Sequence, residues 1–492
     1  MAKNILFSLL FVVTMIGCSD DPEPSLPVLD PDQFTAIPDH GFEYILLRLG
    51  IDTDGILNGT VANRDIMYLE DLNIRDSNIR DLSGIENFQS LKYLNCEYNK
   101  LEEIDLSLNF VLVSLNCAFN ELSSLDLSEN KALRQLNLRE NDISVLDLSN
   151  NKLLLELEVS ENELSSLDLS KNRNLMTLEI YYTNIASIDL SHVPNLRSLS
   201  FGDSPLSELN LRNNKQLEEL HLEYLFSLKT LDLSQNINLI RLNYNNLDIT
   251  TFDFRNLTKL EELSCRGNEL TNLDLSSNIA LEELDCSYNI LNTIDLSQNS
   301  RLTSLSCREN ELSTLDLGSL INLKSLDCSD NELVEIDLSK NSQLEQLTCN
   351  NNQLTSIDLG TTSDLKFIEI SDNNLKSLDL SANRKLESVS CMSNDLQEIN
   401  LGDKYELNGL NCGENLLRSL DLSKTKSLSY FIAENNRLNS LNLRNGRNYI
   451  LERINVKDNP DLGCIEVDDP FYARQQYDWH KDTSADFAES CE

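Results

Sequence analysis

The sequence predicts a solenoid of short, stacked β-strands, because one segment recurs along most of the 492-residue chain. Residues 94–109 read LNCEYNKLEEIDLSLN, and residues 115–130 read LNCAFNELSSLDLSEN, twenty-one residues later. The aligned copies give the template LxxLxCxxNxLxxLDLSxNxx. A chain of this length is long for one compact core, whereas a repeat array needs none, since each copy packs only on its neighbours.

The period and the leucine spacing identify the type of repeat. A period of about 20 to 29 residues with LxxLxLxxN is typical of leucine-rich repeats, each a short strand and a return segment stacked into a horseshoe. The cysteine position of the template recurs eighteen times, and a divergent copy at Ile74 gives about nineteen repeats within residues 66–459. We expect a parallel sheet on the concave face. The return segment is too short for a full helix, so the convex side should consist of short extended or 3₁₀ segments around the LDLS motif.

The cysteine position is predicted to lie in the core. Nine of the eighteen copies hold Cys, and a buried free cysteine behaves as a small hydrophobe. The other copies hold Leu138, Val159, Ile180, Phe201, Leu222, Tyr244, Ile370, Ala433 and Val456. The alternatives are disulfides between neighbouring copies, or a metal or catalytic thiol. We favour free thiols, because side chains of stacked strands point in parallel and nine is an odd number. The pattern resembles the cysteine-ladder repeats of internalin-like surface proteins.

A second column follows the LDLS motif and holds Asp in fourteen copies, with Asn210, Asn400 and Asn442 at the same position. The aspartates are Asp105, Asp126, Asp147, Asp168, Asp189, Asp232, Asp253, Asp274, Asp295, Asp316, Asp337, Asp358, Asp379 and Asp421. Stacked carboxylates could bind calcium. Asn shares with Asp the ability to cap backbone N–H groups at a turn, but not the charge. We therefore favour structural capping.

The N-terminus has the features of an export signal. Lys3 precedes the apolar run 5–16, which ends in Met15-Ile16-Gly17-Cys18 and is too short to span a membrane. Residues 1–17 resemble a lipoprotein signal peptide in which Cys18 is lipidated; the alternative is an ordinary cleaved signal with a chance cysteine. Residues 18–33 read as an acidic, Pro-rich tether. Their acidic start resembles the surface-export signal of Bacteroidota lipoproteins, which implies an outer-membrane lipoprotein anchored through Cys18 and facing outward.

A solenoid exposes its core at both ends and needs caps. Residues 34–65 are predicted to be the N-terminal cap and resemble the segment that precedes the repeats in Bacteroidota internalin-like proteins. Phe42, Ile45, Leu46 and Leu49 are spaced along one face of a helix. Asp52-Thr53-Asp54-Gly55 looks like the start of a calcium loop. The closing position of an EF-hand counted from Asp52 is Asn63, which is not acidic, so we expect no metal site there.

Residues 460–492 are predicted to be the C-terminal cap. They contain Cys464 and Cys491, the two cysteines that follow the ladder, which we expect to form a disulfide pinning the tail over the last repeat. The same segment resembles the C-terminal cap of the internalin-like family. His480 lies between the two cysteines, and we expect it to be a surface residue and not a ligand.

Charge and motifs limit the possible functions. The net charge of −41 makes nucleic acid and anionic lipid poor partners. The sequence has no nucleophile elbow, phosphate-binding glycine loop or HExxH motif, so we expect no enzyme and no cofactor. An enzyme using paired concave carboxylates, Glu156, Glu158, Glu179 or Glu223, is a third alternative. The main contest is between a monomeric recognition scaffold that binds protein or glycan and a passive spacer; resemblance to internalins implies adhesion or host contact.

The candidate ligand site is predicted where the repeat breaks its own pattern. The inward Asn after the strand is present in fourteen of eighteen copies, but four consecutive copies hold Thr183, Ser204, Leu225 and Leu247. These copies also lack the ladder cysteine, and a one-residue insertion falls between Leu222 and Tyr244. Repeat drift is the alternative explanation for this block.

The outward positions of the four irregular copies are rich in aromatic and polar residues, which dominate binding hot spots. They are Glu179, Tyr181, Tyr182, Asp203, Glu219, His221, Glu223, Tyr224, Arg241, Asn243 and Asn245. We expect Tyr181, Tyr182 and Tyr224 to form a concave aromatic patch. Glu179, His221 and Arg241 would then set specificity by hydrogen bonds to a peptide or sugar.

Overall fold

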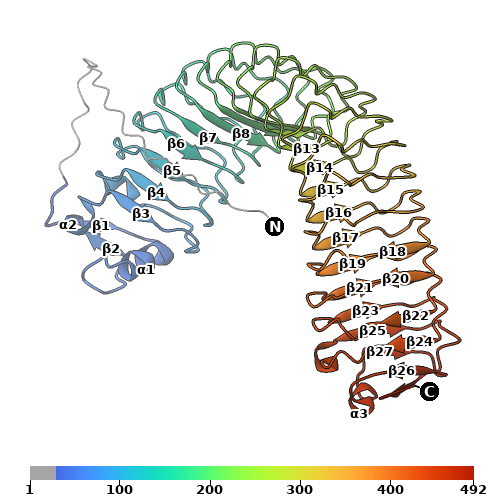
Figure 1. Ribbon diagram of the computed structural model, residues 1–492. Helices are drawn as coiled ribbons and strands as arrows, with labels where there is room; N and C mark the ends of the chain where they lie inside the picture. Colours follow the sequence, from blue (N-terminus) through green and yellow to red (C-terminus); the bar gives the residue numbers. More distant parts are fainter. Residues whose placement is uncertain (1–28, 492) are drawn as a thin grey trace.

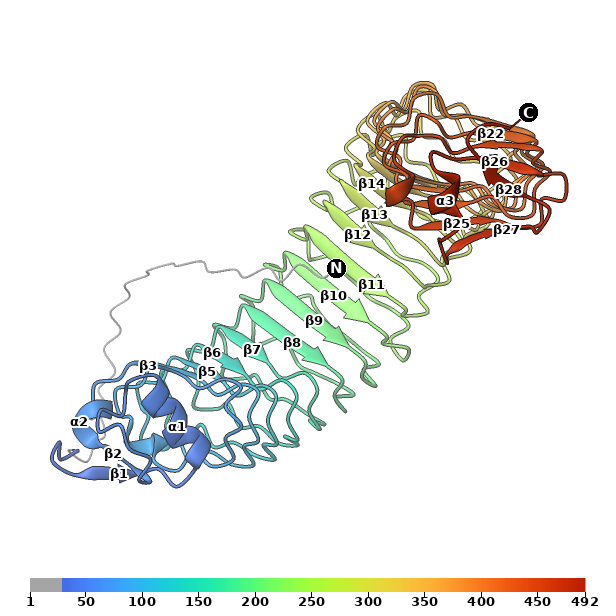
Figure 2. The same ribbon diagram turned by 90° about the horizontal axis from the view of Figure 1, so that it is seen from below.

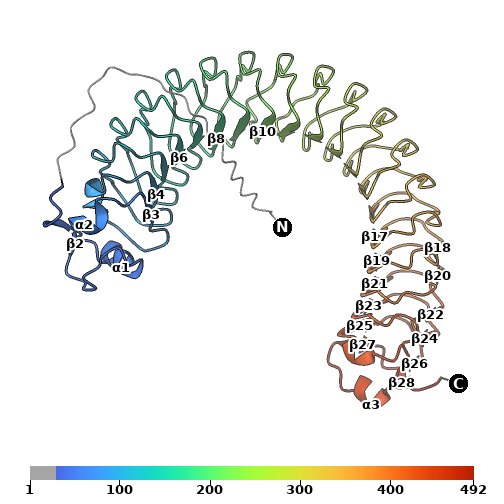
Figure 3. The same ribbon diagram turned by 60° about the vertical axis from the view of Figure 1, so that its left-hand side comes forward.

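The computed structural model describes residues 29–491, which form one continuous arch of stacked coils (Figure 1). Twenty strands line the concave side as a parallel sheet, and each strand pairs with that of the next coil. Figure 3 shows the coils edge-on, with these strands inside the curve and the return segments outside. The predicted leucine-rich-repeat horseshoe is therefore confirmed. The predicted signal peptide, Cys18 and most of the tether lie outside the described residues.

The strands of the concave sheet follow one another in chain order. They are β3 (Asp71–Asn73), β4 (Tyr93–Asn95), β5 (Ser114–Asn116), β6 (Gln135–Asn137), β7 (Glu156–Glu158), β8 (Thr177–Tyr181), β9 (Ser198–Gly202), β10 (Glu219–Glu223), β11 (Arg241–Asn245), β12 (Glu262–Ser264), β13 (Glu283–Asp285), β14 (Ser304–Ser306), β15 (Ser325–Asp327), β16 (Gln346–Thr348), β17 (Phe367–Glu369), β19 (Ser388–Ser390), β21 (Gly409–Asn411), β23 (Tyr430–Ile432), β25 (Arg453–Val456) and β27 (Trp479–Lys481).

The convex side is mostly irregular, with extended pieces that pair only near the C-terminal end. The pairing strands are β18 (Ser377–Asp379) with β20 (Glu398–Asn400), and β22 (Ser419–Asp421), β24 (Ser440–Asn442), β26 (Cys464–Glu466) and β28 (Asp486–Ala488) in a second sheet. Among the described residues, 3₁₀ turns occur only at η1 (Ile85–Asn87) and η2 (Asn448–Ile450). Of the two kinds of convex segment that were predicted, extended segments are therefore more common than 3₁₀ turns.

Alternation along each concave strand separates the core from the surface. In β14, Leu305 is buried, while Ser304 and Ser306 on either side of it are only partly covered. All nine ladder cysteines are buried and free, as predicted. Burial raises the pKa of Cys265 and Cys391 to about 12. Because the thiolate is the reactive and metal-binding form, these side chains act as packing residues at neutral pH.

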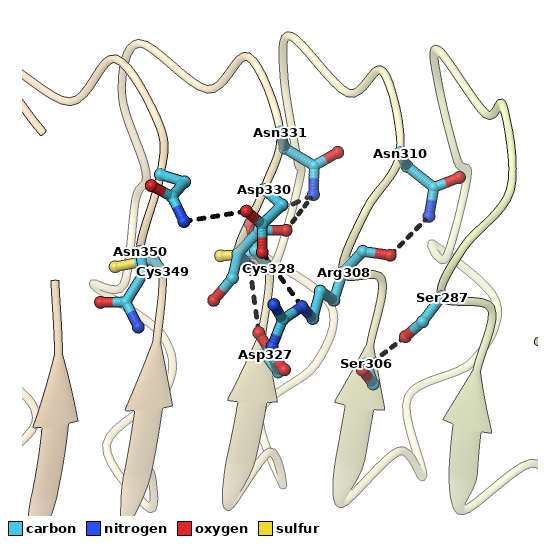
Figure 4. Close-up of polar contacts among 12 residues, drawn as sticks. Ser287, Ser306, Arg308, Asn310, Asp327, Cys328, Asp330, Asn331, Cys349 and Asn350 are labelled. Atoms are coloured by element: carbon cyan, nitrogen blue, oxygen red, sulfur yellow. Dashed lines mark hydrogen bonds and ion pairs between the residues drawn. The ribbon is translucent and has the colours of Figure 1, made fainter. Parts of the chain in front are cut away.

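The asparagine that follows each strand joins neighbouring coils. Asn331 Oδ1 accepts a hydrogen bond from Leu312 N at 3.0 Å, and Asn331 Nδ2 donates to Cys307 O at 3.0 Å. Asn331 Nδ2 also donates to the carbonyl of Cys328 in its own coil at 3.1 Å; Figure 4 shows where Asn331 and Cys328 lie. The amide therefore satisfies backbone groups of its own coil and of the coil before it. The other thirteen copies make equivalent bonds, for example Asn99 near the start of the array.

The aspartate column of the LDLS motif caps turns, as predicted. Asp295 Oδ1 accepts from Ser297 N at 2.9 Å, and this hydrogen bond holds the pKa of Asp295 below its usual value. Asn442 makes the same bond to Arg444 N at 2.9 Å without a charge. The interchange of Asp and Asn at this position therefore follows from the shared turn geometry.

A second asparagine column lies on the convex side and was not predicted. Each side chain is buried and donates through Nδ2 to carbonyl oxygens of the preceding coil; Asn383 Nδ2, for example, lies 3.1 Å from Leu359 O and 2.7 Å from Thr362 O. The column contains Asn109, Asn130, Asn151, Asn172, Asn214, Asn236, Asn278, Asn299, Asn341 and Asn383. It ties together the return segments, as the first column ties together the strands.

The N-terminal cap consists of helix α1 (His40–Arg48), helix α2 (Asn63–Ile66) and the antiparallel pair β1 (Phe34–Ala36) and β2 (Thr60–Ala62). Phe42, Ile45 and Leu46 of α1 pack inward as predicted. The expectation for Leu49 is wrong, because α1 ends at Arg48 and the Leu49 side chain is 49% exposed.

At the C-terminal end, β27 continues the concave sheet beyond the last repeat, and short helix α3 (Pro470–Ala473) precedes it. The predicted disulfide between Cys464 and Cys491 is present. Trp479 Nε1 donates to Leu451 O at 3.0 Å, which fixes the cap to the final coil. No helix within residues 29–491 has the length and apolarity needed to cross a bilayer.

Lys404 occupies a position of the convex column that usually holds Asn. The side chain is fully buried, and its Nζ donates to Leu380 O at 2.7 Å, the acceptor that an asparagine would use. Burial, with a smaller effect of Arg384, lowers the pKa of Lys404 from 10.5 to about 8. The folded protein therefore carries a cost for the charged lysine at neutral pH.

Lys404→Asn is expected to stabilise the protein by up to about 3 kcal/mol at pH 7. The unfolded lysine titrates near 10.5 and the folded one near 8, so the cost is complete below pH 8 and disappears as the pH rises toward 10.5. Denaturant unfolding of wild type and variant at pH 7 and pH 10 measures the difference. An advantage of the variant that does not shrink at pH 10 would contradict this assignment.

Candidate binding surface on the concave face

The four consecutive repeats without the strand-end asparagine have longer strands. β8, β9, β10 and β11 each contain five residues, whereas β7 and β12 on either side contain three (Figure 2). The extra pairs include Tyr181 with Gly202 and Glu223 with Gly202. Without an amide to bond the backbone, the strands continue by pairing main chain with main chain. The predicted irregular block is therefore a distinct structural region.

Polar side chains on these strands bond to one another across the sheet. Asn243 Nδ2 and His221 Nδ1 are hydrogen-bonded at 2.8 Å, and burial lowers the pKa of His221. Arg241 bridges Glu219 and Glu262, the latter at 3.1 Å. Asn245 Nδ2 donates to Glu223 at 3.3 Å. This network holds donors and acceptors in fixed positions on the concave face.

Tyr181 lies on the strand face, as predicted, and depends on its neighbour. A Cβ added to Gly202 would lie 2.6 Å from Tyr181 Cδ1, so the tyrosine ring covers the glycine on the next strand. Burial raises the pKa of Tyr181 to about 12. The ring presents a half-buried aromatic surface that is held in one place.

Tyr182 and Tyr224 do not lie on the strand face. Each follows its strand in a left-handed backbone conformation, with φ of 50° and 54°. Their side chains are 58% and 43% exposed, and Tyr224 packs near Phe226 with ring centroids 6.2 Å apart. The expectation of one concave patch is therefore corrected: Tyr181 belongs to the strand surface, and the other two tyrosines lie at the edge where the chain leaves the sheet.

Glu158 and Glu179 face each other on adjacent strands β7 and β8. Burial first, and then the hydrogen bond and charge of Glu179, raise the pKa of Glu158 to about 8. Glu158 therefore retains its proton more readily than an exposed glutamate. The pair lies at one end of a hollow of about 620 Å³ over β5–β8, lined also by Asn116, Asn137 and Glu156. Sequence reasoning missed this pairing, although the two glutamates are twenty-one residues apart and must be neighbours in stacked coils.

A second hollow lies over the last three concave strands. Its volume is about 580 Å³, and His480 lines it together with Tyr430, Arg453 and Asp478. His480 is partly exposed, in keeping with the expectation of a surface residue. Within residues 29–491, no three His, Cys, Asp or Glu side chains are gathered closely enough to hold a metal ion among themselves.

Solved structures share this architecture. YopM from Yersinia enterocolitica matches with a TM-score of 0.65 and 22% identity, covering 91% of this chain and 99% of that chain. A leucine-rich-repeat protein of Leptospira interrogans has a TM-score of 0.64 and 21% identity, covering 68% and 92%. The internalin InlF from Listeria monocytogenes has a TM-score of 0.55 and 22% identity, covering 68% and 95%.

No protein-family model matches this sequence, and no curated protein does. At these identities, the likeness to the solved structures establishes the fold. The resemblance to internalin-like repeats is thus confirmed for the architecture of the chain.

Gly202→Ala tests the support of Tyr181. The added methyl group would clash with the tyrosine ring and lie 2.8 Å from Glu223 O, so we expect destabilisation by about 1 to 3 kcal/mol. Gly409→Ala, on concave strand β21, is the matched control, because its nearest atom would be Ser388 Oγ at 3.5 Å. Denaturant unfolding and near-ultraviolet circular dichroism measure both variants. Equal effects at the two glycines would show that the Tyr181 ring does not occupy this position.

Proposed function

We propose that this protein is a non-enzymatic recognition scaffold at the cell surface, and that it binds a protein or glycan ligand through strands β7–β11. The observation that carries the proposal is the coincidence of three features in one block: longer strands, a bonded polar network and aromatic side chains. Tyr and Arg supply large contact areas with polar groups, which suits a binding hot spot.

Binding is favoured over catalysis by the arrangement of the carboxylates. Glycoside hydrolysis needs two carboxyl groups separated by about 5 to 9.5 Å, with the substrate bond between them. Glu158 and Glu179 instead lie side by side on adjacent strands, and burial together with Glu179 raises the pKa of Glu158 to about 8. Such a pair suits hydrogen bonding to a ligand better than attack from two sides of a substrate bond.

Binding is also favoured over a passive spacer. A spacer needs only uniform coils, and β14 and β15, whose outward residues are Ser or Asp, supply that pattern. In β10 and β11 the same positions hold half-buried His221 and Arg241, and the longer β8 adds half-buried Tyr181. Immobilised polar groups and an aromatic ring lower the entropy cost of ligand binding, since they are already ordered.

The first test concerns the predicted anchor. Cys18→Ala should abolish incorporation of labelled fatty acid and release the chain from the membrane fraction, because lipidation would be the attachment. Surface proteolysis of intact cells should digest the wild-type repeats if the chain faces outward. A Cys18→Ala variant that remains membrane-bound would contradict lipid anchoring.

The second test concerns the tyrosines. Glycan arrays and pull-down with the purified repeats would first identify a ligand. Tyr182→Ala and Tyr224→Ala should then weaken its binding by about 1 to 3 kcal/mol, measured by calorimetry. Tyr288 also follows its strand in the left-handed conformation, with φ of 56°, but lies outside the block; Tyr288→Ala should leave the affinity unchanged.

Ser304→Ala and Ser306→Ala on β14 provide a second control and should also leave the affinity unchanged. If Tyr288 or the serines matter and the two block tyrosines do not, the ligand site lies elsewhere on the arch.

A further inference from the structure

The loop between α1 and α2 in the N-terminal cap carries side-chain oxygens that the binding surface does not use. Asp52, Asp54 and Asn58 lie in this loop, and Asp65 lies in α2. The four residues thus come from a helix–loop–helix segment. The arrangement is far from the concave block in sequence and belongs to the cap.

The carboxylate of Asp52 is buried and is not fully hydrogen-bonded. Its side chain is only 4% exposed, and its Oδ2 has no hydrogen-bond partner. A buried carboxylate among other carboxylates is costly unless a cation or a donor compensates it.

The spacing of the acidic residues matches that of a twelve-residue EF-hand loop if the loop contains two extra residues. Counted directly from Asp52, the twelfth residue is Asn63, whose side chain is already bonded to Thr35 Oγ1 and Asp30 O. Ile56 and Leu57 are 62% and 50% exposed, as expected of an insertion that bulges into solvent.

Removing the two inserted residues from the count places each key residue where an EF-hand needs it. Asn58 becomes the fifth residue, and Gly59, with φ of 80°, becomes the sixth, where an EF-hand needs glycine for its sharp turn. Val61 becomes the eighth residue and is buried in β2. Asp65 becomes the twelfth, the closing position.

The closing carboxylate already faces the start of the loop. Asp65 Oδ2 accepts from Thr53 Oγ1 at 2.8 Å and from Thr53 N at 3.3 Å. Glu43 of α1 holds the loop against the helix, since its Oε1 accepts a hydrogen bond from Gly59 N at 2.6 Å. Thr53 and Asp65, twelve residues apart near the two ends of the loop, are therefore held together.

We propose that this loop binds one calcium ion. The ligands are carboxylate oxygens of Asp52, Asp54 and Asp65, the amide oxygen of Asn58 and the backbone carbonyl of Thr60, the oxygen donors that calcium prefers. Asp54 Oδ2 accepts from Asn58 Nδ2 at 2.7 Å, and Asp65 Oδ2 accepts from Thr53. Asn58 Oδ1 accepts from Thr60 N and Thr60 Oγ1 at 2.9 and 2.7 Å, so the ligand oxygens are not yet gathered on one point. Binding exchanges these bonds for the ion and closes the loop.

Calorimetric titration of the purified chain with CaCl₂ at physiological salt tests the proposal. One site is expected, with a Kd on the order of 10⁻⁴ to 10⁻³ M, the range of extracellular calcium modules. Asp52→Asn and Asp65→Asn should each weaken binding at least about tenfold. Asp295→Asn removes the same charge from the exposed aspartate column and should change nothing. Deletion of Ile56 and Leu57 should leave the affinity unchanged or tighter.

Thermal unfolding separates lost binding from misfolding. In EDTA, Asp52→Asn should melt no lower than wild type, because it removes a buried unpaired charge. Excess calcium should raise the melting temperature of wild type but not that of the variant. The proposal is overturned if the wild type does not bind calcium below about 10⁻² M, or if Asp295→Asn weakens binding as much as Asp52→Asn.

Discussion

The side-chain amide of a buried asparagine holds each coil of this solenoid to the coil before it. Asn331 uses both ends of its amide, accepting from one coil and donating to two carbonyl groups. A parallel coil leaves backbone groups unpaired where the chain turns out of the sheet, and burying them without partners is costly. The amide satisfies these groups in a dry interior, so the leucines and cysteines around it can remain apolar.

Where this amide is absent, the architecture changes over several coils together. Strands β8–β11 lengthen, and main-chain pairing replaces the amide bonds. A longer strand adds an outward position, which Tyr181 and Glu223 occupy. Tyr181 then requires Gly202 beside it, since any Cβ there would meet the ring. The candidate surface is thus a structural consequence of losing the strand-end asparagines, and the positions of its residues depend on one another.

The horseshoe and the free cysteines were predictable because a repeat averages out the noise of any single copy, and the terminal disulfide because Cys464 and Cys491 lie outside the ladder. The positions of Tyr182 and Tyr224 were not predicted correctly. The prediction assigned each of them to the strand, whereas each is the first residue after the strand and has a left-handed backbone conformation. The left-handed residue after each strand is Glu161, Asp330 or Ser393 in other copies, and only Gly267 carries the usual glycine signal. Contacts between side chains of neighbouring coils can be predicted only by comparing residues twenty-one positions apart. Glu158 and Glu179 are such a pair.

The two asparagine columns differ in how each amide bonds to the neighbouring coils. Convex asparagines bond through Nδ2, while their Oδ1 atoms have no hydrogen-bond partner. That column is interrupted at Val193, Leu257, Leu320 and Thr362, and in two neighbouring copies at Lys404 and Thr425. Each of these amides bonds only through its NH₂ group. Replacing one asparagine therefore affects the contacts of one coil, and the column tolerates substitution at many of its positions.

The strand-end column behaves differently because each amide bonds at both ends. It is interrupted only in one run, from Thr183 to Leu247. An isolated loss there would leave backbone groups of two coils unpaired, whereas neighbouring losses allow the strands to extend together. The block therefore keeps its backbone groups paired because its four copies differ together. Their longer strands carry Tyr181, His221 and Arg241 on the outward side.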